Sequence, residues 1–310
     1  MITIPETDLV VHPLCLGGNV FGWSADAAQS HAVLDAYLGH GGNFVDTADM
    51  YSQWKEGNTG GDSERIIGTW IKSRANRNQM VIATKVAKMA QRPGLSTANI
   101  IAACDDSLDR LQTDYLDIYY SHQDDESVSV EETMGAYAQL IAQGKVRYIA
   151  ASNFTPARLQ AALAFSAENS LPAYVAVQDQ YNLMVREPFE SQTAPILAEH
   201  AISAIPFFGL ARGFLTGKYR PGLAVDSVRA AGVSDYTNDR GYGVVAVLDE
   251  IAKSHNVSLG AVALAWLRAN PVVSVPIASA RTVEQLIEII QVAELTPDEI
   301  QKLNNASNYI

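Results

Sequence analysis

The chain has 310 residues, of which 48% are hydrophobic and 18% charged, a composition typical of a globular protein long enough to bury a large core. Its formal net charge of −12 argues against a nucleic-acid or anionic-membrane surface, because those partners require clustered Lys and Arg. We find no basic leader followed by an apolar run and no apolar stretch long enough to span a bilayer, so we expect a cytoplasmic protein.

The organisation of the chain and its two cysteines give two further expectations. No low-complexity tract or linker interrupts the chain, which predicts a single domain over residues 1–310. Cys15 and Cys104 both lie in apolar segments, which fits two packing residues in a reducing compartment better than a disulfide.

Short apolar segments alternate with longer amphipathic ones from Cys15 onward. One helix is expected over residues 25–38, begun by Ser24 and stopped by Gly39, and another over Thr97–Leu111. The eight expected strands cover residues 14–16, 43–45, 80–83, 116–120, 146–150, 174–177, 202–207 and 272–276.

Eight strand–helix units in a chain of this length favour a closed (β/α)8 TIM barrel over an open doubly wound sheet. The open sheet would require G-x-G-x-x-G after the first strand, and residues 16–22 do not fit that pattern. Extra helices are expected before strand 8, over residues 242–254 and 259–270, and at the C-terminus from Thr296. The Gly- and Arg-rich segment 209–236 is interpreted as a flap over a ligand.

Four chemistry-bearing side chains follow neighbouring strands: Asp46, Tyr51, Lys85 and His122. A tyrosine can protonate a carbonyl oxygen, but its ordinary pKa near 10 makes it a weak acid at neutral pH. We expect the Lys85 ammonium to lower that pKa, Asp46 to keep Lys85 charged and His122 to position the substrate oxygen.

In order and context, these four residues resemble the aldo-keto reductases, and the resemblance extends over nearly the whole chain. It implies reversible reduction of an aldehyde or ketone with a nicotinamide cofactor, because no side chain can supply a hydride. At the nicotinamide end it implies Ser152, Asn153 and Gln178 as binding residues, with Phe207 stacking on the ring.

The same resemblance assigns further cofactor contacts along the chain. They are Gly18, Asn19 and Val20 near the first strand, Leu210, Ala211, Gly213, Leu215 and Lys218 over the pyrophosphate, and Ser279, Arg281, Gln285 and Glu288 at the adenine end. A hydroxyl and a guanidinium at Ser279 and Arg281 suit a 2′-phosphate, which favours NADP(H) over NADH. Ile289 departs from the family pattern, which often has asparagine there.

Trp23 and Trp54 are expected to wall the substrate pocket, although an exposed Trp serves an oligomer contact equally well. The pocket loops carry few charges of one sign, so no charged class of carbonyl substrate is favoured.

Two alternatives stay open at this point. The potassium-channel β subunits share the barrel and the four residues, which allows a redox-sensing NADPH-binding subunit. A metal-dependent hydrolase could use Asp46, His122, Asp124 and Asp125, but no motif supplies a second histidine, so no metal is expected.

Overall fold

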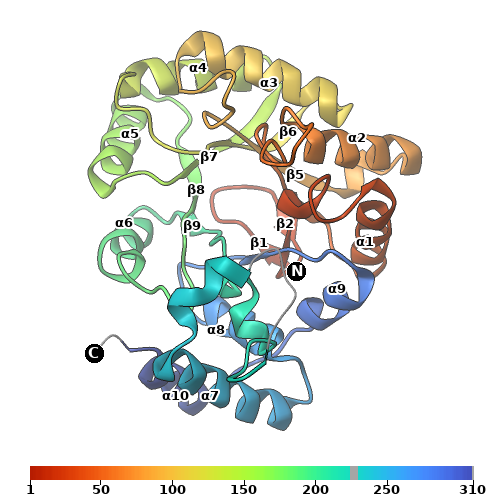
Figure 1. Cartoon of the computed structure of the whole chain (residues 1–310). Helices are drawn as coiled ribbons and strands as arrows, with labels where there is room; N and C mark the ends of the chain where they lie inside the picture. Colours follow the sequence, from red (N-terminus) through yellow and green to blue (C-terminus); the bar gives the residue numbers. More distant parts are fainter. Residues whose placement is uncertain (224–229, 309–310) are drawn as a thin grey trace.

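The computed structural model describes residues 1–223 and 230–308. Its centre is a curled parallel sheet with strand order β10-β3-β4-β5-β6-β7-β8-β9, surrounded by helices (Figure 1). The strands are β3 (Cys15–Gly17), β4 (Phe44–Asp46), β5 (Val81–Val86), β6 (Leu116–Ser121), β7 (Val146–Ser152), β8 (Tyr174–Gln178), β9 (Ser203–Ala204) and β10 (Ile277–Ala278).

Helices alternate with these strands and enclose the sheet (Figure 1). They are α1 (Ala27–Gly39), α2 (Asp62–Arg74), α3 (Thr97–Leu111), α4 (Val130–Ala142), α5 (Pro156–Asn169), α6 (Ala194–Glu199), α7 (Asp239–His255), α8 (Leu259–Arg268), α9 (Val283–Ile290) and α10 (Pro297–Ser307). Among the helices described, none has the length and apolar character needed to cross a membrane.

Backbone hydrogen bonds connect segment 272–277, which leads into β10, to the region of β9. The amide of Ala204 donates to the carbonyl of Val272 at 2.7 Å, and the amide of Ile277 donates to the carbonyl of Pro206 at 2.9 Å. The expected (β/α)8 barrel is therefore confirmed, with α7 and α8 before the eighth strand and α10 at the C-terminal side.

The eighth strand lies later than predicted, at Ile277–Ala278 rather than 272–276. Pro276 has no backbone N–H to donate to a ladder, so regular pairing with β3 begins only after it, at Ile277 opposite Cys15. Segment 272–276 still contributes single backbone contacts, such as the carbonyl of Pro276 accepting from the amide of Cys15 at 3.0 Å.

The start of the first helix also differs from the prediction. Asp26, not Ser24, caps α1, because its carboxylate accepts from the amide of Gln29 while the Gln29 side chain accepts from the Asp26 amide. Gly39 belongs to the helix, and Gly41, with φ +79°, makes the turn that follows.

A hairpin that was not predicted packs at the amino ends of the barrel strands. It comprises β1 (Ile2–Thr3) and β2 (Val10–Val11), paired antiparallel. Ile4 and Leu9 from its turn are buried in the same apolar cluster as Phe44 near the start of β4. Because this end of the barrel is filled, a ligand has to approach the opposite end, where the strands terminate in polar side chains.

Segment 209–236 contains two 3₁₀-helices, η4 (Ala211–Thr216) and η5 (Ala230–Tyr236). The middle of the predicted flap, residues 224–229, lies outside the described residues.

Candidate active site

Asp46 and Lys85 form a buried ion pair at the carboxyl ends of β4 and β5. Lys85 Nζ lies 2.5 Å from Asp46 Oδ2 and 2.7 Å from the backbone oxygen of Thr47, and the Lys85 side chain has no solvent-accessible surface. Parallel pairing of β4 with β5 brings the two residues together although they are 39 positions apart. An ammonium in this position needs both oxygen partners, because burial alone would favour its neutral form.

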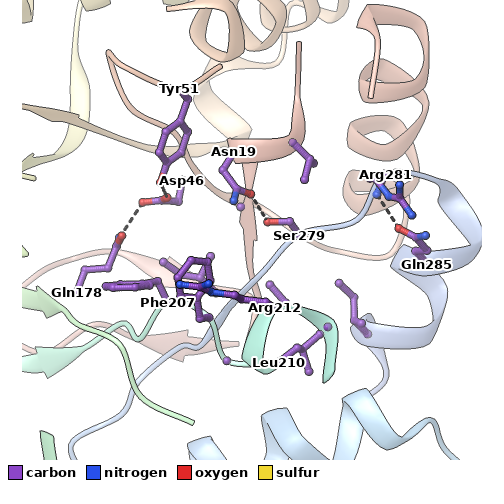
Figure 2. A pocket seen from close by; sticks show the side chains of 18 of the residues that line it. Asn19, Asp46, Tyr51, Gln178, Phe207, Leu210, Arg212, Ser279, Arg281 and Gln285 are labelled. Carbon is purple, nitrogen blue, oxygen red and sulfur yellow. Dashed lines mark hydrogen bonds between the residues drawn. The ribbon is translucent and has the colours of Figure 1, made fainter. Parts of the chain in front are cut away.

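The hydroxyl of Tyr51 completes a three-residue cluster with this pair. Lys85 Nζ donates to Tyr51 Oη at 3.1 Å, and Tyr51 Oη lies 3.4 Å from Asp46 Oδ2 (Figure 2). The loop that carries Tyr51 is tied down by the next residue, Ser52, whose hydroxyl donates to the carbonyl of Phe21 at 2.7 Å.

The pKa of Tyr51 shifts opposite to the expected direction. Burial first, and then the negative charge of Asp46, raises the Tyr51 pKa well above its ordinary value of 10.0. Burial also lowers the pKa of Lys85, and Asp46 opposes that change. The predicted lowering of the Tyr51 pKa is therefore wrong, because burial and the charge of Asp46 decide its direction. Tyr51 holds its proton, and Lys85 can stabilise the phenolate only once the proton has left.

His122 follows β6 and is neutral. Burial, followed by the positive charges of Lys85 and Lys88, lowers its pKa well below 6.5. Its ring centroid lies 5.9 Å from that of Tyr51, edge to face, so both side chains border one space. A neutral imidazole can hydrogen-bond a carbonyl oxygen without adding a charge.

The four clustered residues lie at one end of a cavity of about 610 Å³. The cavity brings together residues from both ends of the chain, including Asn19 and Ser279, whose side chains meet at 2.6 Å (Figure 2). Predicted site residues that line it are Asn19, Val20, Asp46, Tyr51, Trp54, His122, Ser152, Asn153, Gln178, Phe207, Leu210, Gly213, Lys218, Ser279, Arg281, Gln285 and Glu288.

The polar residues Ser152, Asn153 and Gln178, beside Asp46, are joined by hydrogen bonds. Gln178 Nε2 donates to Asp46 Oδ1 at 2.8 Å, and Ser152 Oγ donates to the backbone oxygen of Gln178 at 2.6 Å. Asn153 Nδ2 donates both to Ser152 Oγ and to the backbone oxygen of His122, each at 2.9 Å. These bonds orient the three side chains toward one end of the cavity.

Five predicted residues do not line the cavity. Gly17 rather than Gly18 lines the cavity, and the carbonyl of Gly18 accepts a hydrogen bond from Ser63 Oγ at 2.8 Å. The side chains of Ala211 and Leu215 are buried in the core beneath η4, and Lys85 is covered by its partners. Trp23 packs edge-on against Trp54, with ring centroids 5.7 Å apart.

Sequence reasoning missed several cavity residues, among them Lys88, Arg212, Phe208 and Thr216. Arg212 lies within the glycine-containing segment already singled out, and its guanidinium sits 4.9 Å from the ring centroid of Phe208. Lys218 and Arg281 are further cations in the cavity wall. Their grouping depends on how η4 approaches α9, which no local pattern shows.

Asp124 and Asp125, considered as metal ligands, have structural partners. Asp124 pairs with Arg158 at 2.9 Å, and Asp125 accepts from the amide of Leu95 at 2.9 Å. Within the described ranges, no three His, Cys, Asp or Glu side chains are grouped closely enough to hold a metal ion. Both cysteines are buried and free, as predicted from the sequence.

The parallel barrel thus brings a buried Asp–Lys pair, a tyrosine bonded to it and a histidine to one large cavity, an arrangement suited to proton transfer. The Aldo/keto reductase family model matches residues 13–308, and the chain belongs to this family.

Three relatives illustrate the range of the family. The chain is 32% identical to Protein tas of Escherichia coli, with 99% of this chain and 98% of the relative covered. It is 31% identical to norsolorinic acid reductase of Aspergillus flavus, covering 96% and 78%. It is 32% identical, covering 86% and 80%, to a Schizosaccharomyces pombe protein provisionally assigned as a voltage-gated potassium channel subunit beta.

Proposed function

We propose that this protein is an NADP(H)-dependent reductase that reversibly converts an aldehyde or ketone into an alcohol, with Tyr51 as proton donor. The observation that carries the proposal is the Tyr51 hydroxyl, bonded to Lys85 at 3.1 Å and bordering the cavity with His122. The named reductase among the relatives supports the same class of reaction.

The cavity residues fit a dinucleotide phosphate. Arg212, Lys218 and Arg281 place positive charge in the cavity wall, whereas the chain as a whole has a formal net charge of −12. Arg212 Nε is buried and, among the residues described, has no hydrogen-bond acceptor, which an anionic ligand would supply. Gly213, with φ +94°, allows close backbone approach beside Lys218.

A bound nicotinamide would supply a hydride to the carbonyl carbon. Tyr51 Oη then transfers its proton to the carbonyl oxygen, and the product is the alcohol. The phenolate left behind is disfavoured by burial and by Asp46, but the Lys85 ammonium at 3.1 Å offsets part of that cost. His122 positions the oxygen, while Gln178, Ser152 and Asn153 would hold the nicotinamide carboxamide.

Replacing Tyr51 by Phe tests the assignment. Turnover of NADPH with simple aldehydes should fall by roughly 10²–10⁴-fold, the usual contribution of a general acid. The NADPH dissociation constant should stay nearly the same, because the phenol contacts the carbonyl rather than the phosphates. Tyr115→Phe, beside Arg77 and outside the cavity lining, is the matched control. Unchanged turnover in Tyr51→Phe would remove the basis of the proposal.

A redox-sensing NADPH-binding subunit is the second candidate, favoured by the S. pombe relative. Steady-state oxidation of NADPH with a panel of aldehydes separates the two. A sensor would bind NADPH tightly and turn over very slowly with every aldehyde, whereas a reductase would turn over repeatedly with at least one.

A further inference from the structure

We propose that Lys88 selects carbonyl substrates that carry an anionic group, such as a carboxylate. This inference rests on the proposed function and adds to it the class of substrate. Lys88 lies three residues beyond Lys85, on the loop that follows β5, and its half-buried side chain lines the same cavity as Tyr51, His122 and Trp54.

The positive charge of Lys88 acts on His122, which borders the same cavity as Tyr51. It is one of two cations that lower the pKa of His122, the other being Lys85. Lys85 is neutralised by the carboxylate of Asp46 at 2.5 Å. Across the residues that the structure describes, Lys88 makes no ion pair or hydrogen bond with the protein. It is therefore an unneutralised cation in the wall of the cavity that Tyr51 and His122 also border.

The acidic residues of the cavity do not compete for this charge. Among the described residues that line the cavity, Asp46 and Glu288 are the carboxylates. Asp46 is occupied by Lys85, Tyr51 and Gln178, and Glu288 lies on α9 beside Gln285 and Ile289 at the end assigned to the adenine. The other cations among the described lining residues, Arg212, Lys218 and Arg281, are those assigned to the cofactor phosphates. Lys88 is therefore the cation that we assign to substrate binding.

The aromatic side chains beside Tyr51 and the Lys88 ammonium suit a carbonyl compound that has an apolar body and an anionic substituent. Trp54 supplies a ring face beside Tyr51, with centroids 6.1 Å apart. An ammonium attracts a carboxylate most strongly where the wall excludes water, and such a pair is screened less by salt than an exposed one. The sequence-based expectation of no charge preference overlooked Lys88, because its place in the wall depends on the path of the loop after β5.

The test compares two aldehydes of similar size, 4-carboxybenzaldehyde and benzaldehyde, as the ratio of their kcat/KM values with NADPH. The wild-type ratio should be at least tenfold in favour of the carboxylate. Lys88→Met should lower that ratio at least tenfold, and Lys88→Arg should retain most of it. Lys55→Met removes the same charge from an exposed residue outside the cavity lining and should leave the ratio unchanged.

A binding measurement separates this inference from the proposed reaction. Benzoate and benzamide are unreactive probes whose binding can be followed through the fluorescence of the exposed Trp54. Benzoate should bind more tightly to the wild type, and Lys88→Met should abolish the difference. If the wild type reduces both aldehydes but Lys88→Met leaves both comparisons unchanged, Lys88 has no selective role although the reductase assignment stands. If benzoate selection depends on Lys88 but no aldehyde is reduced, the proposed function fails and the anion site remains.

Discussion

Gln178 and Asp46, separated by 132 positions, are joined by a 2.8 Å hydrogen bond from Gln178 Nε2 to Asp46 Oδ1 at the open end of the barrel. The second carboxylate oxygen accepts from Lys85. Asp46 is thereby held between the ammonium and the amide, and Gln178 links the region assigned to the nicotinamide to the proton-transfer cluster.

Gln178→Met should therefore affect catalysis as well as cofactor binding. The variant keeps the length of the side chain but removes the donor to Asp46 Oδ1. Losing a hydrogen bond to a buried charge corresponds to about 1.5–3 kcal/mol, or roughly 10–100-fold. We expect kcat at saturating NADPH to fall by that order. An unchanged kcat with reduced stability would show that Gln178 only satisfies the buried carboxylate.

Arg281→Ala tests the preference for NADP(H). If the guanidinium meets the 2′-phosphate, the NADPH dissociation constant should rise by roughly 10–100-fold, the range expected for a charged hydrogen bond, while that for NADH changes little. Titration by quenching of protein fluorescence measures both constants. Arg65→Ala, a partly exposed residue of α2 outside the cavity lining, is the control. An equal loss for both dinucleotides would mean that no phosphate is contacted at Arg281.

Asp49 should make the protein less stable at neutral than at mildly acidic pH. Burial, and then the charge of Glu64, raises its pKa from 3.8 to about 7. Between these values the native state holds a proton that the unfolded chain has released, so stability falls as pH rises from about 4 to about 7 and is level above. From pH 5 to pH 8 this amounts to roughly 2–3 kcal/mol, at about 1.4 kcal/mol per pKa unit.

Asp49→Asn removes this titration. Urea unfolding should show that the variant gains roughly 2–3 kcal/mol more, relative to the wild type, at pH 8 than at pH 5. Asp114→Asn, at an exposed position, should show no such difference. The same relative stability of Asp49→Asn at both pH values would contradict the raised pKa.

Two helical glycines should respond in opposite ways to alanine. A Cβ at Gly68 of α2 would lie 2.2 Å from the backbone oxygen of Arg110 in α3, so Gly68→Ala must separate the helices and should cost about 1–3 kcal/mol or more. Gly135 of α4 has nothing within 4 Å, and Gly135→Ala should stabilise by roughly 0.5–1 kcal/mol. Urea unfolding measures both, and an equal effect would rule out close contact at Gly68.

The barrel and the types of residue at its open end could be predicted from local sequence patterns alone. The alternation of apolar strands with amphipathic helices is a local property, and so is the position of Asp46, Lys85 and Gln178 at strand ends. The exact starts of two elements were predicted less well. Asp26 rather than Ser24 caps α1, and the eighth strand begins after Pro276, at Ile277.

The interactions among the site residues, by contrast, depend on the packed three-dimensional fold. The pKa of Tyr51 depends on the balance between desolvation and the charges of Asp46 and Lys85, and burial is set by the whole packed barrel. Likewise, the pairing of Gln178 with Asp46 and the position of Lys88 in the cavity wall result from strands and loops distant in sequence. Non-local packing sets distances and desolvation, and these quantities decide the sign and strength of each electrostatic effect.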